Sequence, residues 1–587
     1  MKEFDKELAQ YGILAKNGKQ NIKDDKITIL DAEIKEINFQ KLQAEGIKEI
    51  CISRSEIKYL YFLEKNTIKI DFRNCNFKNQ IIARELYFKN EVIFRQCVFD
   101  VVVDFAEAKF DSKIDFSLSV FKGEVRFIKA QFSAKQSNNE TIENNFREVI
   151  FEGKASFSNA TFKARVNFVL SQFKNDSNFE EINFQAKQSD DKIIENNFRE
   201  IIFGERVSFL RTVFKGRVKF TLSQFKNDAN FSEINFQAKQ SDDKIIENNF
   251  EGIIFQARVF FVNSIFQARV SFRVSKFKDE TFFSNIKLNN HIFHNVEFNK
   301  INFIHNNYIN AESYVFQNAV FKDALRFKGM EFERLGFDNV LFNGVVTFSN
   351  TKLNTKPQFK NCTFSNQFNI EHKYIEYNFN EIKNTQEYDK LLNYRDLFRK
   401  LKSNRIAHHN LIDASELRTQ ELYARELELK YKEKKSLREI IERWQLFFYR
   451  KLCDHHTDLL LNLKWLVVLI GSFVLLYFTS RVIQDVNLLK VLNQYGVCLS
   501  IVGVFNLLCL YWFGCIKKFD FFVYFNLIAV LWVICYKPKI IFGIVNLTGD
   551  NSYNGFENAL ITIYTILLAL VLFSLQKTAR KNSIVPS

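Results

Sequence analysis

The most regular feature of the chain is the spacing of its phenylalanines. In FSNATFKARVNFVLSQFKNDSNF they stand at positions 157, 162, 168, 173 and 179, so that gaps of five and six residues alternate. An amphipathic helix repeats its apolar residues every three or four positions, and a half-buried strand every two. The pattern therefore indicates neither a helix nor a single strand.

A longer repeat explains this spacing. The segment NFQAKQSDDKIIENNF occurs at Asn183–Phe198 and again 52 residues later at Asn235–Phe250, with a diverged copy at Gln131–Phe146. In each copy one phenylalanine gap, such as that from Phe184 to Phe198, exceeds the usual gap of six by eight. Without the eight extra residues the period is 44, or two units of 22. The arithmetic predicts a solenoid with about 22 residues per turn and an inserted loop at the same corner of every second turn.

In such a coil the phenylalanines point inward and stack from turn to turn. A second inward position lies two residues before each phenylalanine, where only a small or slender side chain fits. Ala155, Ala160, Val166 and Ser171 occupy this position in the quoted segment. The remaining residues are mostly polar, so each turn buries its apolar face only against its neighbours.

These units resemble those of the pentapeptide-repeat family, in which a small residue stands two positions before a central Leu or Phe. NATF, NCNF (Asn74–Phe77) and NCTF (Asn361–Phe364) carry the resemblance, which extends over roughly residues 30–370. It implies a β-solenoid in the form of a right-handed quadrilateral β-helix. About 14 turns at a strand spacing of ~4.8 Å correspond to a rod of roughly 70 Å.

Helical periodicity replaces the phenylalanine pattern after Glu376. Leu391, Leu397, Phe398 and Leu401 form one apolar stripe, and a second charged stretch with periodic leucines follows it. The two predicted helices would form a hairpin able to cap the open end of the solenoid. The sequence YRDLFRKLKSN…ELYAREL is also similar to linker helices in membrane-attached pentapeptide-repeat proteins.

A third helix is predicted to lie at a membrane surface. Ser436 and Glu439 have the spacing of a capping box and open this helix. Trp444, Phe447 and Phe448 then alternate with arginine and lysine immediately before an apolar segment. Aromatic and basic side chains in this position are typical of an interfacial helix.

Four apolar stretches near the C-terminus predict transmembrane helices, since each is close to the length needed to cross a bilayer. Gly496, Ser500 and Gly503 offer a small-residue face for close packing, and Asn506 and Asn526 are candidates for hydrogen bonds between helices. The basic residues on one predicted side are Arg450, Lys451, Lys464, Lys517, Lys518, Lys577, Arg580 and Lys581, and those on the other are Arg481, Lys490, Lys537 and Lys539. This excess predicts an inner (plasma) membrane protein with both termini in the cytoplasm.

The predicted organisation has four parts. The segments are 1–28, an N-terminal segment; 29–372, a β-helix with inserted loops near 134–145, 186–197 and 238–249; 377–452, a helical linker; and 459–480, 489–515, 519–536 and 557–576, the transmembrane helices. The N-terminal segment contains no apolar run of the kind found in a secretory signal.

Composition agrees with a repeat protein. The chain has 587 residues, too many for a single core, and 67 of them are phenylalanine, whereas only 3 are proline and 18 glycine. An array of hairpins would need many more turn residues. The nine cysteines include no CxxC pair, which indicates a reducing compartment rather than a disulfide framework.

Charge argues against nucleic acid as a partner. The net charge is +15, and within the repeats basic residues alternate with acidic ones. Some pentapeptide-repeat proteins are acidic rods that imitate DNA, but this rod is slightly basic. Its cations also form no blocks of the kind that bind phosphate backbones.

No motif for catalysis, cofactor binding or metal binding is evident, so we expect a protein that is not an enzyme. Gly-rich phosphate loops and the motifs HExxH and GxSxG are absent from the sequence. The stretch CDHHTD (Cys453–Asp458) concentrates metal-ligand types, but adjacent histidines on a helix point about 100° apart. We therefore expect His455 and His456 to be solvated at a helix end.

The predicted function is that of an integral membrane protein whose cytoplasmic repeat rod is a scaffold for protein interaction, with the lipid bilayer and a protein as its partners. The alternative is an ion channel or pore regulated by the repeat domain. The segment Lys539–Gly555, which contains Thr548 and Asp550, lies where a re-entrant pore loop would be. It matches a potassium filter poorly, because such filters need consecutive inward carbonyl groups. The binding residues, the partner's identity and the oligomeric state stay open.

Overall fold

The computed structural model describes residues 5–134, 142–186, 195–238, 247–286, 288, 291–306, 311–385, 387–485, 493–536, 538–542 and 553–580. The chain divides into two compact units, Met1–Ile375 and Glu376–Ser587.

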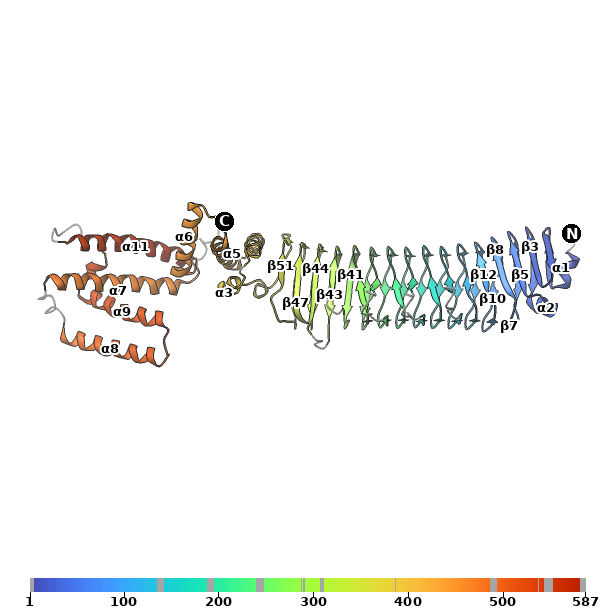
Figure 1. Ribbon diagram of the computed structural model, residues 1–587, viewed down its shortest axis with the longest axis horizontal. Coiled ribbons are helices and arrows are strands. Elements are labelled where there is room, and N and C mark those ends of the chain that lie inside the picture. The colour runs from blue at the N-terminus through green and yellow to red at the C-terminus, as the bar shows by residue number, and fades with distance from the viewer. Residues whose placement is uncertain are drawn as a thin grey trace. The chain divides into compact units, whose positions relative to one another are not determined.

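The first unit is a β-solenoid of about 14 turns over residues 26–364, drawn in blue to yellow in Figure 1. A regular turn contains four short strands, for example β8 (Lys69–Arg73), β9 (Asn76–Phe77), β10 (Ile81–Ile82) and β11 (Tyr87–Phe88). Each of these strands pairs in parallel with its equivalent in the next turn, so that the turns stack as four ladders. The fold class predicted from the sequence is confirmed.

The first and second ladders contain most of the longer strands. The first ladder is β2 (Lys19–Lys23), β3 (Lys26–Leu30), β5 (Glu49–Ser53), β8, β12 (Val92–Arg95), β16 (Ile114–Asp115), β20 (Glu143–Asn145), β24 (Arg165–Asn167), β28 (Glu195–Asn197), β32 (Arg217–Lys219), β36 (Glu247–Asn249) and β40 (Arg269–Ser271). The second ladder is β1 (Ile13–Lys16), β4 (Glu33–Asn38), β6 (Glu56–Tyr61), β9, β13 (Val98–Phe99), β17 (Val120–Phe121), β21 (Ile150–Phe151), β25 (Gln172–Phe173), β29 (Ile202–Phe203), β33 (Gln224–Phe225) and β37 (Ile254–Phe255).

The third and fourth ladders complete the turns. The third is β10, β14 (Val103–Asp104), β18 (Val125–Arg126), β22 (Ala155–Ser156), β26 (Ser177–Asn178), β30 (Val207–Ser208), β34 (Ala229–Asn230) and β38 (Val259–Val262). The fourth is β7 (Lys65–Asn66), β11, β15 (Lys109–Phe110), β19 (Gln131–Phe132), β23 (Thr161–Phe162), β27 (Asn183–Phe184), β31 (Val213–Phe214), β35 (Asn235–Phe236) and β39 (Ile265–Phe266).

The last turns are less regular because neighbouring strands merge. In β41 (Lys276–Ser284) and β43 (Glu297–Ile304) the second and third ladders continue as single long strands. The remaining strands are β42 (Ile292–His294), β44 (Glu312–Gln317), β45 (Val320–Phe321), β46 (Leu325–Lys328), β47 (Glu331–Asp338), β48 (Leu341–Phe342), β49 (Val346–Ser349), β50 (Lys352–Leu353), β51 (Gln358–Lys360) and β52 (Thr363–Phe364).

Stacked phenylalanine rings form the core, as the spacing predicts. Phe157 and Phe179, one turn apart, have ring centroids 5.1 Å apart and planes inclined by 13°. Phe168, which follows a strand of the first ladder, meets Phe157 edge-on at 5.5 Å and 88°. Offset-stacked and edge-to-face pairs each add about 0.5–1.5 kcal/mol beyond the burial of area. The small inward residues at 155, 160, 166 and 171 are buried, again as predicted.

In the middle of the solenoid, alternate turns contain eight more residues than their neighbours. Phe99 pairs with Phe121 at an offset of 22, whereas Phe121 pairs with Phe151 at an offset of 30. The extra residues fall between the fourth and first ladders, as the repeat arithmetic predicts. Residues 135–141, 187–194 and 239–246, the middle of each predicted loop, lie outside the described residues.

The N-terminal segment covers the first edge of the solenoid, a feature absent from our sequence-based interpretation. β1 pairs antiparallel with β4, and β2 pairs antiparallel with β3, whereas the strand pairs of the later turns are parallel. Short helices α1 (Lys6–Gln10) and α2 (Phe39–Ala44) bury Leu8 and Phe39 beside them. An uncovered edge strand would expose a template for aggregation, and this cap covers that edge.

The second unit is helical. Its helices are α3 (Phe379–Lys383), α4 (Tyr388–Ala407), α5 (Leu411–Tyr431), α6 (Leu437–Cys453), α7 (Leu459–Gln484), α8 (Gln494–Trp512), α9 (Lys518–Tyr536), the 3₁₀ turn η3 (Pro538–Ile541) and α11 (Gly555–Ala579). The predicted hairpin is formed by α4 and α5, which pack along their lengths. Ser436 and Glu439 make the predicted capping box at the start of α6.

Four helices, α7, α8, α9 and α11, are long and apolar enough to cross a membrane. α7 packs against both α9 and α11. It approaches α9 closely at Gly471, where a Cβ atom would lie 2.6 Å from Asn526. Asn526 accepts a hydrogen bond from Ser472 at 3.1 Å, as the sequence predicts, whereas Asn506 is exposed.

The predicted small-residue face of α8 packs against α9. Trp532 donates a hydrogen bond to the Ser500 hydroxyl at 2.7 Å, and its ring lies over Gly496. A side chain at Gly496 would meet this ring at 2.8 Å, so glycine is required for the close approach.

Ion pairs mark the two ends of the apolar part of α7. Lys464 binds Asp520 of α9 at 2.5 Å, and Arg481 binds Glu557 of α11 at 3.2 Å. Along α7, the stretch from Lys464 to Arg481 corresponds to about 26 Å of helix. This separation is close to the thickness of a bilayer core, about 30 Å.

Candidate functional site

One corner of the solenoid, between the first and second ladders, holds a left-handed residue in every turn. Asparagine, which tolerates positive φ better than other non-glycine residues, occurs once at this corner in the early turns and repeatedly in the last turns. The asparagines are Asn74, Asn295, Asn318, Asn339 and Asn361, with φ between 52° and 55°. The backbone N–H of Asn74 donates to a carbonyl of the next turn, and other corner residues donate in the same way, which keeps the corner in register.

In the middle of the solenoid the same corner carries branched apolar residues in every second turn. Leu118, Leu170, Leu222 and Val274 have φ values of 62°, 62°, 60° and 57°. Their side chains are 42%, 38%, 51% and 49% exposed. A non-glycine residue in this conformation costs of the order of 1–3 kcal/mol, and an exposed apolar side chain recovers little of that cost. Neither property benefits the isolated solenoid.

A serine follows each of these four residues and holds the corner. The Ser223 hydroxyl donates to the Phe198 carbonyl oxygen at 2.6 Å and accepts from the Ile201 backbone N–H at 3.2 Å. The equivalent hydroxyls that donate in the same way belong to Ser119, Ser171 and Ser275. The local motif is therefore Leu/Val-Ser-x-Phe, repeated every 52 residues.

Half-buried aliphatic side chains of the second ladder fill the gaps between the corner residues. The apolar stripe formed in this way consists of Leu118, Val120, Ile150, Leu170, Ile202, Leu222, Ile254 and Val274. In the turns with Leu170 or Leu222 at the corner, the outward residue of the second ladder is glutamine. In the turns between and beside them, the corner residue is glutamate or glycine and the outward ladder residue is isoleucine. The stripe therefore zigzags over six turn spacings, or about 29 Å.

Gly252 extends the apolar surface around Leu222. Gly252 has a φ of 68° at the same corner, one turn further on. A Cβ atom at Gly252 would lie 2.7 Å from Cδ2 of Leu222, so the leucine lies over the glycine. Any other residue at 252 would force this leucine to move.

The third ladder forms a shallow polar groove of about 700 Å³. Its floor consists of small outward side chains, including Ser156, Asn178, Ser208 and Asn230. One rim alternates in charge from turn to turn: Glu124, Lys154, Asp176, Arg206 and Asp228. The charges of neighbouring turns cancel, so the rim has no extended positive potential that would attract nucleic acid.

Helix α6 exposes one apolar face, as expected for an interfacial helix. Leu437, Ile441, Trp444 and Phe448 are exposed at helical spacing. The opposite face bonds to α5, where Arg450 contacts Glu426 through two hydrogen bonds of 2.7 and 2.8 Å. The arrangement leaves the aromatic face of α6 free to lie in a membrane surface.

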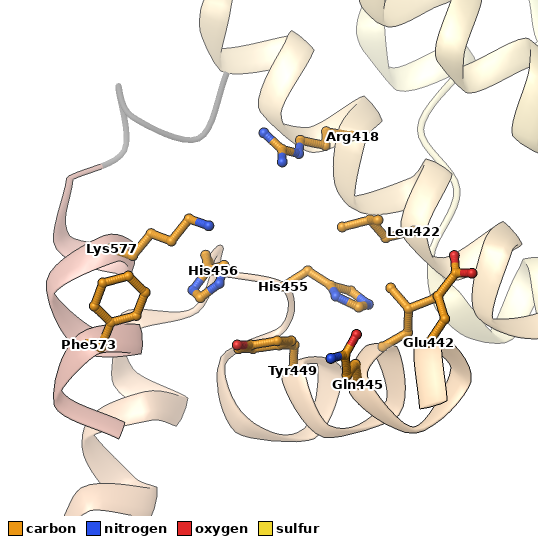
Figure 2. Close-up of a pocket in the computed structure, with 10 residues that line it drawn as sticks. Arg418, Leu422, Glu442, Gln445, Tyr449, His455, His456, Phe573 and Lys577 are labelled. Atoms are coloured by element: carbon orange, nitrogen blue, oxygen red, sulfur yellow. The ribbon is translucent and has the colours of Figure 1, made fainter. Parts of the chain in front are cut away.

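A cavity of about 250 Å³ lies among α5, α6, the turn after α6 and the end of α11. Figure 2 shows Arg418 and Lys577 bordering it, with His455 and His456 between them and Tyr449. Glu442 also lines the cavity, but Arg425 binds its carboxylate through hydrogen bonds of 2.8 and 2.9 Å.

The expectation that His455 and His456 are solvated at a helix end is wrong for His455, which is buried, whereas His456 is half-buried. Asp454, His455 and His456 have φ values of 46°, 54° and 74°, so the chain makes a left-handed turn that carries the histidines inward. His455 is only 4% exposed. The Nδ1 atom of His456 lies 3.2 Å from the hydroxyl of Thr578. Local sequence could not reveal this burial, because α11 supplies covering residues from a distant part of the chain.

Burial also affects the protonation of both rings. Desolvation, followed by the charge of Arg450, lowers the pKa of His455 to about 3. Desolvation, followed by the charges of Lys577 and then Arg418, lowers the pKa of His456 to about 4. Both histidines are therefore neutral near pH 7. The two cations of the cavity, Lys577 and Arg418, both lower the pKa of the same side chain, His456.

The other sequence-based hypotheses on sites have different outcomes. Within the described parts of the chain, no three His, Cys, Asp or Glu side chains are grouped to hold a metal ion. Thr548 and Asp550 of the hypothetical pore loop lie outside the described residues. The apolar stripe was missed, although the LS that precedes QF at Leu170 and Leu222 was visible in the sequence.

Comparison of the chain with models of protein families, with curated proteins and with solved structures found no match. The stacked phenylalanine ladders are consistent with pentapeptide repeats.

Proposed function

We propose that this protein is a membrane-anchored scaffold whose apolar stripe binds an amphipathic helix of a partner protein. Four helices anchor the chain in the inner (plasma) membrane, and the solenoid and both termini lie in the cytoplasm. The observation that supports the proposal most strongly is the set of exposed corner residues Leu118, Leu170, Leu222 and Val274. They combine backbone strain with exposure where asparagine would relieve both, and docking of a partner would bury them.

The dimensions of the stripe suit a helix. Corner leucines in alternate turns are about 9.6 Å apart, and positions i and i+7 of an α-helix are about 10.5 Å apart. The stripe length of about 29 Å corresponds to a helix of about 19 residues. Helix-in-groove recognition commonly uses such periodic apolar anchors. Binding of this kind needs no catalysis, and the proposal assigns none.

The test exploits the asparagines found at the same corner of other turns. A Leu170→Asn/Leu222→Asn variant removes two apolar anchors and replaces them with the non-glycine residue best suited to a left-handed backbone. A photo-crosslinker at Gln172 should trap a partner protein in native cells. We expect the yield of this adduct to fall at least about 10-fold in the variant, because each leucine contributes on the order of 1 kcal/mol or more when buried.

Glu200→Asn provides the matched control, since Glu200 occupies the same corner one turn away, with φ of 57°. This control should leave the adduct unchanged, and all proteins should have the same far-ultraviolet circular dichroism. An adduct that survives the double leucine substitution contradicts the proposal. An adduct with a second copy of this chain would replace the scaffold hypothesis with self-association.

A further inference from the structure

The cavity between α5, α6 and α11 has the chemistry of an anion site. Its wall contains Arg418, on α5, and Lys577, in the last turn of α11. Neither cation forms an ion pair within the described residues, whereas Glu442, the cavity's carboxylate, is already bound to Arg425. The unpaired charge facing the cavity is therefore positive.

A buried and unsatisfied imidazole points to the same chemistry. Nε2 of His455 is buried and has no hydrogen-bond partner among the described residues. A buried polar atom without a partner destabilises the fold, so such atoms often indicate a missing ligand or water. With its Nε2 protonated, neutral His455 donates to an anion without any titration.

Neighbouring side chains add donors and apolar surface. The Tyr449 hydroxyl and the Gln445 amide border the cavity and are able to donate hydrogen bonds. Phe573, which is exposed, and Leu446 form its apolar edge. The cavity is equivalent to about eight water volumes, enough for a phosphate group with a few waters.

We propose that this cavity binds a phosphate group, held by Arg418 and Lys577 and accepting a hydrogen bond from His455. The group belongs either to an anionic phospholipid or to free phosphate. Position favours the lipid, because Lys577 ends the apolar helix α11, and because α6, which also lines the cavity, exposes an aromatic face. Phosphate groups of a bilayer lie at such a helix end.

The experiment uses the full chain and two probes. In neutral detergent, inorganic phosphate is titrated at constant ionic strength against chloride, and binding is followed by calorimetry. In nanodiscs, thermal stability is compared between pure phosphatidylcholine and phosphatidylcholine with phosphatidate. We expect Arg418→Gln and Lys577→Gln each to weaken binding at least about 10-fold, the usual order for loss of a charge-assisted hydrogen bond.

Arg438→Gln is the matched control, because Arg438 is an exposed arginine on α6 outside the cavity. Binding of inorganic phosphate that depends on Arg418 and Lys577 supports free phosphate as the ligand. Stabilisation by phosphatidate alone, with the same dependence, supports the lipid. If neither probe binds, or if Arg438→Gln weakens binding as much as the cavity variants do, the site does not exist. Two cavity variants on different helices keep the test informative if one of them fails to fold.

Discussion

Ser223 illustrates how single side chains determine the corner of this solenoid. Its hydroxyl bridges two backbone groups of the preceding turn, next to a leucine that holds a left-handed conformation. The two hydrogen bonds offset part of the backbone strain at Leu222, about 1–3 kcal/mol for such a residue. The serine and the strained leucine therefore form one unit, and both recur every 52 residues.

Replacing Ser223 with alanine should destabilise the corner. The substitution leaves the Phe198 carbonyl and the Ile201 N–H without their shared partner, at a cost of about 1–3 kcal/mol. We expect faster hydrogen exchange at Ile201 and Leu222 and a lower thermal midpoint. Ser232→Ala, at a half-buried serine of another corner whose hydroxyl forms no such bridge in the described structure, should change neither. Equal protection in both variants would show that the hydroxyl is dispensable.

At the scale of elements, the solenoid behaves as a stack of nearly equivalent turns. Four phenylalanine ladders continue through turns that differ by eight residues in length, because the extra residues are confined to one corner. Each turn contacts only its neighbours, so the stability of the stack is approximately a sum of local terms. The repeating unit of structure is one turn, but the repeating unit of sequence is two.

Deletion of one complete sequence repeat should therefore be tolerated. Removal of residues 178–229 joins Ser177 to Asn230, which is equivalent to Asn178 two turns earlier. Every phenylalanine then keeps its ladder, and we expect a folded protein with slightly reduced stability, measured by circular dichroism and thermal unfolding.

Removal of residues 178–224 tests the same idea with a shorter deletion. It moves Phe225 into an outward position and shifts all later ladders. We expect this protein to aggregate or unfold. If it folds as well as the protein with the complete repeat removed, the register of the ladders is not what specifies the structure.

At the scale of the whole molecule, ion pairs connect the candidate membrane helices. The pairs Lys464–Asp520 and Arg481–Glu557 connect α7 to α9 and α11 at opposite ends of one apolar span. Each pair neutralises its charges near one end of α7, where the side chains are close to water. The part of α7 between the two pairs is apolar. With the excess of basic residues on one side, this arrangement is the basis for the proposed cytoplasmic termini.

Accessibility labelling tests this orientation. In a chain with exposed Cys498, Cys515 and Cys535 replaced by serine, Asp485→Cys marks the end of α7 and Lys517→Cys precedes α9. A membrane-impermeant maleimide should label Asp485→Cys in intact cells, and Lys517→Cys only after permeabilisation. The reverse labelling would place the solenoid outside the cytoplasm.

Much of the fold follows from local pattern. The phenylalanine spacing predicts the length of a turn, the inward positions and the inserted corner, because each is a matter of register along the chain. The capping box at Ser436 and the four apolar helices are likewise local properties. The N-terminal cap was not anticipated, since the antiparallel pairing of β1 with β4 depends on the solenoid edge that it covers.

The candidate sites could not be predicted from the local sequence pattern. Sequence alone determined that a phenylalanine coil and apolar helices would form, because periodic burial of large apolar area dominates both. Only the tertiary structure decided that leucines at 118, 170 and 222 align on one exposed corner, and that His455 is buried between helices α5, α6 and α11. Both depend on which residues meet across turns or distant helices, and free energies of burial and charge are set by those neighbours in space.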